Sequence, residues 1–174
     1  MANSIPDAQM IAIDPGEEHV GLAEFQRMPP DAWRKEYEWS CTWAGEMLPG
    51  GALEWITGHL PLLSVVVYEG WQIYPDKAAT LIGSQCETAQ FIGALKWIVL
   101  GFNKQTLVFP DWPPRPGLVG LVEQPASIQI PTRGLLKQAG KKSMAKRIQA
   151  GEHAMSAELH GWCYLHRSGF AVLA

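Results

Sequence analysis

Residues 11–23 read Ile-Ala-Ile-Asp-Pro-Gly-Glu-Glu-His-Val-Gly-Leu-Ala, which is an apolar run, an acidic turn and a second apolar run. The first run, residues 10–13, has the length and β-branching of a strand that is buried on both faces. Pro15 and Gly16 end that strand, and residues 20–25 are expected to pair back beside it in antiparallel fashion. Asp14 then stands at the carboxyl end of the first strand, where ligands gather in α/β sheets. Aspartate is also common in turns, where its side chain makes local hydrogen bonds. Asp14 is therefore either a turn residue or part of a functional site, and further acids at the same sheet edge would favour the site.

The composition indicates one globular domain over residues 1–174. The chain is 47% hydrophobic and 18% charged, as expected for a folded protein with an ordinary core. Its longest apolar run, residues 60–68, is interrupted by Pro61 and Ser64 and is too short to span a bilayer. Residues 1–8 are polar and lack the basic residues followed by an apolar stretch that are typical of a signal peptide. The cysteines are odd in number and widely spaced, which speaks against a disulfide frame or a zinc site and favours a reducing cytoplasm. They are Cys41, Cys86 and Cys163.

A second buried strand carries a second acid to its end. Residues 37–43 alternate aromatic and polar side chains, as a half-buried strand does, and extend the first hairpin into an antiparallel meander. Residues 52–60 predict a short helix, and residues 64–68 predict a β-branched strand that ends at Glu69. A right-handed crossover makes this strand parallel to the first, so Glu69 emerges at the same sheet edge as Asp14. A solvated turn is the alternative for Glu69, but two acids at one edge favour a site.

The rest of the chain alternates helices and strands. The further predicted elements are a turn at 49–51, a helix capped by Asp76 that runs to about residue 100, strands at 106–109 and 118–123, and a last helix at 152–167. On the last helix, His153 and Ser156 lie three residues apart and share a face. His160 and His166 are given no role, because such histidines more often pack or lie on the surface.

The segment from residue 124 to residue 151 contains no acidic residue. In a chain of net charge −3, this asymmetry indicates a polyanionic partner such as DNA. The alternative is a solvated amphipathic helix. The candidate DNA-binding residues of the segment are Arg133, Lys137, Lys141, Lys142, Lys146 and Arg147.

Three short motifs together resemble RuvC-type Holliday junction resolvases, particularly the small versions found in bacteriophages. They are Ile13-Asp14-Pro15-Gly16 followed by Val20-Gly21, then Val65-Val66-Val67-Tyr68-Glu69, and last Glu152-His153-Ala154-Met155-Ser156-Ala157. The resemblance implies an α/β, RNase H-like fold with a mixed five-stranded sheet and helices on both faces. It also implies a metal-dependent endonuclease that cuts branched DNA such as Holliday junctions, acts as a homodimer and works in the cytoplasm of a bacterial host.

The resemblance assigns a role to each motif. Asp14 and Glu69 are expected to hold two Mg²⁺ ions, with Mn²⁺ as a substitute, because hard cations prefer oxygen ligands. Asp14 is expected to bridge the two ions. His153 matches the first position of the family's final motif and is expected to act as general base or to orient the attacking water.

Ser156 departs from the family pattern, which has an aspartate at this position. A serine hydroxyl is a much poorer magnesium ligand than a carboxylate. Glu152, one turn back, or Glu158 then replaces the missing acid, and we expect Glu152 to be the third catalytic carboxylate and metal ligand.

Two alternatives to junction cleavage remain. The departure at Ser156 suits a branched-DNA-binding protein of the same fold that has lost efficient cleavage. A nuclease acting on RNA or on an RNA–DNA hybrid differs only in its substrate, and no residue here discriminates a 2′-hydroxyl. Metal binding at Asp14, Glu69 and the last helix separates the enzyme from the binding protein.

Overall fold

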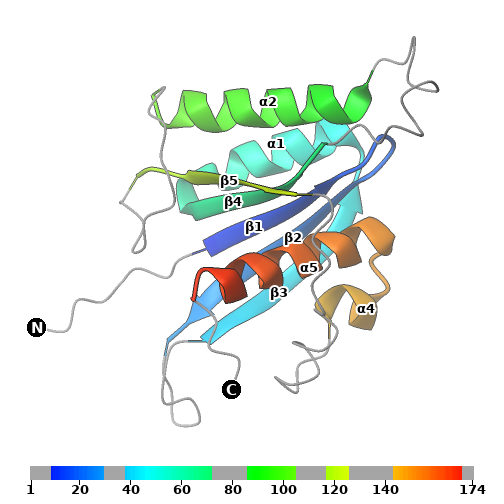
Figure 1. The fold of residues 1–174 in the computed structure, drawn as a ribbon, viewed down its shortest axis with the longest axis vertical. Helices are drawn as coiled ribbons and strands as arrows, with labels where there is room; N and C mark the ends of the chain where they lie inside the picture. Colours follow the sequence, from blue (N-terminus) through cyan, green and yellow to red (C-terminus); the bar gives the residue numbers. More distant parts are fainter. Residues whose placement is uncertain (1–8, 30–37, 72–85, 105–116, 126–142, 170–174) are drawn as a thin grey trace, which may run out of the picture.

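The core of the fold is one mixed β-sheet. A computed structural model describes residues 9–29, 38–71, 86–104, 117–125 and 143–169. The strands are β1 (Gln9–Pro15), β2 (Val20–Met28), β3 (Glu38–Met47), β4 (Leu63–Gly70) and β5 (Gly120–Pro125). Their order is β3-β2-β1-β4-β5 (Figure 1). The first three form an antiparallel meander, whereas β4 runs parallel to β1 and β5 runs parallel to β4. The predicted mixed five-stranded sheet is confirmed.

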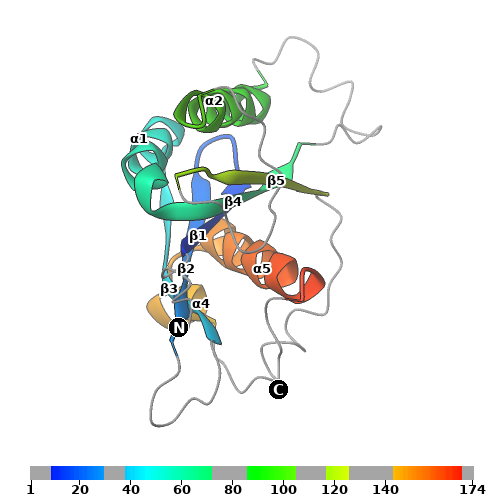
Figure 2. The same ribbon diagram turned by 90° about the vertical axis from the view of Figure 1, so that its left-hand side faces the viewer.

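Helices cover both faces of this sheet. They are α1 (Pro49–His59), α2 (Glu87–Phe102), α4 (Met144–Ile148) and α5 (Glu152–Arg167), with a short 3₁₀ helix at Leu60–Leu62. The first two pack on one face and the last two on the other, as the turned view in Figure 2 shows. This is the RNase H-like arrangement that the motifs imply. Among the described residues, no helix combines the length and the apolarity that crossing a membrane requires.

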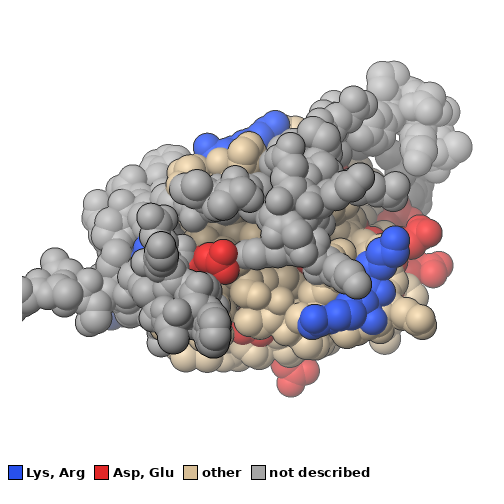
Figure 3. Space-filling view, turned by 90° about the horizontal axis from the view of Figure 1, so that it is seen from below, with Lys and Arg blue, Asp and Glu red and all other residues tan. Residues whose placement is uncertain are grey.

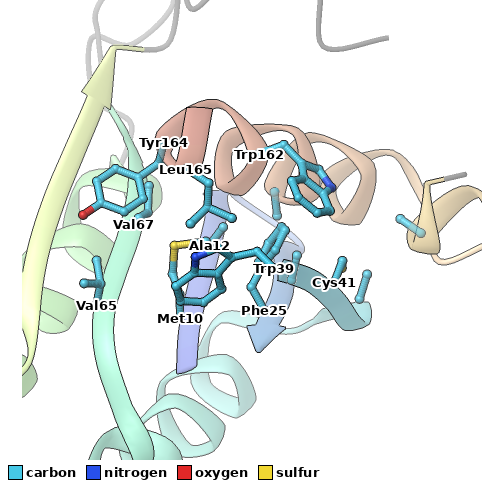
Figure 4. Close-up of a cluster of buried hydrophobic side chains, with 14 of the residues drawn as sticks. Met10, Ala12, Phe25, Trp39, Cys41, Val65, Val67, Trp162, Tyr164 and Leu165 are labelled. Carbon is cyan, nitrogen blue, oxygen red and sulfur yellow. The ribbon is translucent and has the colours of Figure 1, made fainter. Parts of the chain in front are cut away.

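Side chains along β1 alternate between the two faces of the sheet, and apolar side chains on each face are buried by helices. Met10 and Ala12 face α5, whereas Ile11 and Ile13 face α1 and α2, and all are almost completely buried. A strand buried on both faces reads as an unbroken apolar run, as predicted. Figure 4 shows the cluster under α5, in which the ring of Phe25 meets that of Trp162 edge-on at 5.1 Å between centroids.

Several predicted boundaries are corrected. The Pro-Gly-Gly at 49–51 is the first turn of α1, because proline fits the start of a helix. Of the helix predicted from Asp76 to about residue 100, residues 76–85 lie outside the described residues, and α2 begins at Glu87 after Cys86, which adopts a left-handed conformation with φ of 47°. The strand predicted at 106–109 lies outside the described residues. The last helix is confirmed over its whole predicted range.

Candidate active site

The two strand-end acids lie on the same face of the sheet, under α5. Along β1, Asp14 follows Met10 and Ala12 on the α5 side, because side chains alternate between the faces of a strand. Glu69 follows Val65 and Val67 on the same side of β4. The two acids come directly after Ile13 and Tyr68, which are partners in the parallel register of β1 and β4. Neighbouring strands therefore place both carboxylates at one sheet edge, as the sequence predicted.

These acids belong to a row of residues that crosses all five strands. Glu46 of β3 pairs with Gly21 of β2, and Gly21 pairs with Asp14 of β1. Glu69 of β4 comes next, and it pairs with Gln124 of β5. We call Glu46, Gly21, Asp14, Glu69 and Gln124 the cross-sheet row. Every member lies close to α5.

The N-terminal turn of α5 is fixed on the first half of the cross-sheet row. The carboxylate of Glu46 accepts a hydrogen bond from the backbone N–H of His153 at 2.8 Å and one from that of Ala154 at 3.4 Å. Both N–H groups lack partners within the helix, so the acid caps it. A Cβ on Gly21 would overlap the backbone carbonyl of His153. Only glycine permits this closeness between β2 and α5.

The imidazole of His153 is hydrogen-bonded to Asp14. Its Nδ1 lies 3.1 Å from Oδ2 of Asp14. Since a carboxylate only accepts, Nδ1 donates, and in the neutral ring Nε2 then carries the lone pair. The turn at Gly16 lies beside this nitrogen, and the His153 side chain is 44% exposed, so a water molecule can reach it. A base that is oriented by a carboxylate is the usual arrangement for general-base catalysis.

The Asp14 carboxyl has a perturbed acidity. Burial raises its pKa, the negative charge of Glu69 raises it further, and the hydrogen bond from His153 lowers it. Two partly buried carboxylates this close together need a proton or a cation to balance them. Hard divalent cations prefer carboxylate oxygens, so the pair of Asp14 and Glu69 fits one Mg²⁺ or Mn²⁺ ion.

The structure does not add a third acid to this pair. Glu152 lies in the first turn of α5 with an exposed side chain. In the part of the chain that the structure describes, no three histidines, cysteines or acids are grouped so that they could hold a metal ion. Ser156 is half-buried on α5 between His153 and His160. The role of Glu152 as third ligand therefore stays a prediction.

Glu158, the other candidate for the missing acid, is engaged elsewhere. It is 1% exposed and accepts hydrogen bonds from the hydroxyl of Ser143 at 2.6 Å and from the backbone N–H groups of Met144 and Ala145 at 3.0 and 2.9 Å. The indole N–H of Trp162 adds a fourth at 3.3 Å. Glu158 thus caps α4 and fastens it to α5.

His160, to which the sequence assigned no role, contacts the site. It is 7% exposed, and its Nε2 lies 2.9 Å from Oε2 of Glu69. Its position seven residues after His153 was the available signal, because residues two helical turns apart share a face. Each of the two site acids therefore has a histidine partner on α5.

The described part of the basic segment is α4. Lys146 and Arg147 are exposed in its last turn. Figure 3 shows basic side chains gathered at one side of the lower face, on the side where α4 lies in Figure 1. The other four candidates, Arg133, Lys137, Lys141 and Lys142, lie outside the described residues.

Comparisons with known proteins concern the fold. No family model and no curated protein matches the chain. Among solved structures, it is similar to RuvC of T. thermophilus in complex with Holliday junction substrate, at 14% identity over 94% of this chain and 98% of that one, with a TM-score of 0.49. It is also similar to the Fowlpox virus Holliday junction resolvase, at 9% identity over 91% of this chain and 99% of that one, with a TM-score of 0.49. At these identities, function has to be inferred from the residues of the site.

Proposed function

We propose that this protein is a metal-dependent endodeoxyribonuclease that cuts branched DNA such as Holliday junctions. The observation that carries the proposal is the meeting of Asp14 and Glu69 at the ends of two parallel strands, with His153 held against Asp14. The motifs of the sequence imply two Mg²⁺ ions per site, with Mn²⁺ as a substitute. The described carboxylates fit one such ion, and the second depends on Glu152.

The chain's own residues divide the work of phosphodiester hydrolysis. His153 accepts a proton from the attacking water at Nε2, while Asp14 holds the ring by its other nitrogen. Asp14 and Glu69 hold the metal, which when bound activates water and stabilises the negative charge that develops on the departing oxygen.

In this proposal the basic segment binds the DNA. The protein acts as a homodimer. Lys146 and Arg147 on α4 present two positive charges on the same side of the sheet as the two acids. A four-way junction offers two equivalent strands, so a dimer with two-fold symmetry can cut both. We place this activity in the cytoplasm of a bacterial host, as the bacteriophage-type motifs imply.

The second candidate is a branched-DNA-binding protein with weak or lost cleavage. Ser156 in place of an acid, together with the lack of a three-ligand group among the described residues, favours it. The two are separated by incubating the purified protein with four-way, three-way, flap and linear DNA and with an RNA–DNA hybrid, each with Mg²⁺ or Mn²⁺. We expect symmetric cuts in the four-way junction. Tight junction binding without any metal-dependent cut would favour the binding protein.

Replacing both Lys146 and Arg147 with Ala is expected to weaken binding to DNA of any sequence. The slope of log affinity against log salt should fall by about 1 for each lost phosphate contact, because fewer counterions are released. Fluorescence anisotropy with a labelled junction at several salt concentrations measures this slope. Lys104→Ala is the control, since Lys104 follows α2 on the other face of the sheet. A slope equal to that of the wild type would show that α4 is a solvated helix that does not contact DNA.

Replacing Gly21 with Ala is expected to slow cleavage by about 100-fold, the loss typical of a catalytic group displaced by about 1 Å. The added Cβ meets the backbone of His153, which cannot give way unless α5 moves and takes the imidazole away from Asp14. The turnover number on a four-way junction measures the effect. Gly93→Ala on α2 is the control, because an added Cβ meets no atom within 4 Å there. Equal turnover in both variants would contradict the need for this close packing.

A further inference from the structure

The buried imidazole of His160 joins two members of the cross-sheet row. Its Nε2 lies 2.9 Å from Oε2 of Glu69, and its Nδ1 lies 3.1 Å from Oε1 of Gln124. The Glu69 and Gln124 side chains come from the paired strands β4 and β5, and the His160 side chain is 8% exposed. A polar ring in such a place is retained only when its hydrogen bonds are satisfied.

The hydrogen-bond inventory decides the direction of the contact with Glu69. A carboxylate only accepts, so Nε2 of His160 must donate to it. Nδ1 then either donates to the amide oxygen of Gln124, if the ring is doubly protonated, or accepts from its amide nitrogen, if the amide is turned by half a rotation. Both arrangements satisfy both contacts, and both give the same N–H donor to Glu69.

This donor acts against the repulsion between the two acids. Asp14 and Glu69 carry like charges at the ends of neighbouring strands, so the two carboxylates repel each other. The bond from His160 holds one oxygen of Glu69 in place. The ring is itself fixed by Gln124. The helix backbone is also held close to the sheet at the next residue, Gly161, because a Cβ added there would overlap the aromatic ring of Phe25.

We propose that His160 is a positioning residue that holds the carboxylate of Glu69 beside Asp14, and that Gln124 in turn holds His160. The inference rests on the proposed function, because it concerns the same metal site. Partners of metal ligands are known to set the orientation of the ligands, and their loss weakens metal affinity or activity by about 10- to 100-fold.

The test uses the full chain and Mn²⁺ alone as the probe. The variants are His160→Leu, which removes both hydrogen bonds, His160→Gln, which keeps a donor toward Glu69, and Gln124→Leu, which releases only the far side of the ring. His166→Leu is the matched control, since His166 lies exposed near the end of the same helix. Electron paramagnetic resonance measures Mn²⁺ affinity without DNA, and junction cleavage gives kcat and KM.

We expect His160→Leu to weaken Mn²⁺ affinity and lower kcat by about 10- to 100-fold each while KM stays unchanged. His160→Gln should regain a large part of both, and Gln124→Leu should lie between the wild type and His160→Leu. Should His160→Leu fail to fold, the other two variants still carry the comparison.

Two results would overturn the positioning role. One is Mn²⁺ affinity and kcat within twofold of the wild type in all three variants. The other is an equal loss in His160→Gln and His160→Leu, which would show that the ring only fills space. A wild-type protein that binds no Mn²⁺ and cuts no junction would mark the failure of the proposed function instead, and the positioning role would fall with it.

Discussion

Asp14→Asn is expected to abolish metal-dependent cleavage while leaving the fold and junction binding intact. Asn keeps the size of the side chain and an oxygen that can accept from His153, but it removes the charge that a divalent cation needs. We expect cleavage to fall by about 10³-fold or more, at least the loss seen when a group that stabilises the transition state is removed. Glu69→Gln should have the same effect, because both carboxylates would hold the same cation.

The same change should stabilise the metal-free protein. The pKa of Asp14 is raised by burial first and by Glu69 second. A carboxyl with a raised folded-state pKa contributes most to stability below its unfolded pKa, and this contribution is lost as the pH rises through the folded pKa. At neutral pH the ionised Asp14 therefore costs stability, and Asn does not. Each kcal/mol relieved should raise Tm by about 2–4 °C in a chain of this size.

Thermal unfolding in the presence of a chelator measures this gain. It should be largest near neutral pH and should shrink toward about pH 4, where aspartate is also protonated in part in the unfolded chain. Glu17→Gln is the control, since Glu17 is an exposed acid of the neighbouring turn. Full cleavage activity in purified Asp14→Asn would contradict the proposed metal site. An unchanged or lower Tm would show that the ionised Asp14 carboxylate does not cost stability.

Glu158→Ala is expected to lower the free energy of unfolding by about 3 kcal/mol, a large part of the about 5–15 kcal/mol that folded domains possess, because each buried donor left without a partner costs about 1–3 kcal/mol. The loss follows from the buried and partly buried donors that the carboxylate leaves behind. They are the hydroxyl of Ser143, the backbone N–H groups of Met144 and Ala145, and the indole N–H of Trp162. Glu158→Gln should recover little, because its amide group brings a further donor into a place that needs acceptors.

Urea denaturation followed by circular dichroism measures this loss. The control is Glu152→Gln, since Glu152 is an exposed acid of the same helix, and its free energy of unfolding should stay within about 0.5 kcal/mol of the wild type. Equal stability of the Glu158 and Glu152 variants would show that α4 is not fastened in this way. The comparison also separates the two acids as candidates for the position left open at Ser156, because only Glu152 is free to affect cleavage without affecting the fold.

The sequence predicted the part of the site that depends on local pattern. The buried runs that end at Asp14 and Glu69 follow from strand alternation, and the crossover rule gives their shared edge. The spacing of His160 from His153 indicates a shared helix face, but the partners of His160 and of Glu158 could not be predicted, because they depend on how α5 crosses the sheet and on where α4 packs. The start of α2 was missed for a related reason, since the pattern of apolar residues continues through Cys86 while its backbone does not.

The cross-sheet row also has a consequence for folding kinetics. β1 and β2 are joined by a short turn, so their hairpin can form early, whereas the contact between His153 and Asp14 joins residues 139 positions apart. Contacts of such sequence separation form late, because their chain entropy is lost before their contact energy is gained. The acids and the histidines therefore meet only when α5 docks. A nascent or half-folded chain therefore lacks the assembled site, and the activity proposed above would require the complete native topology.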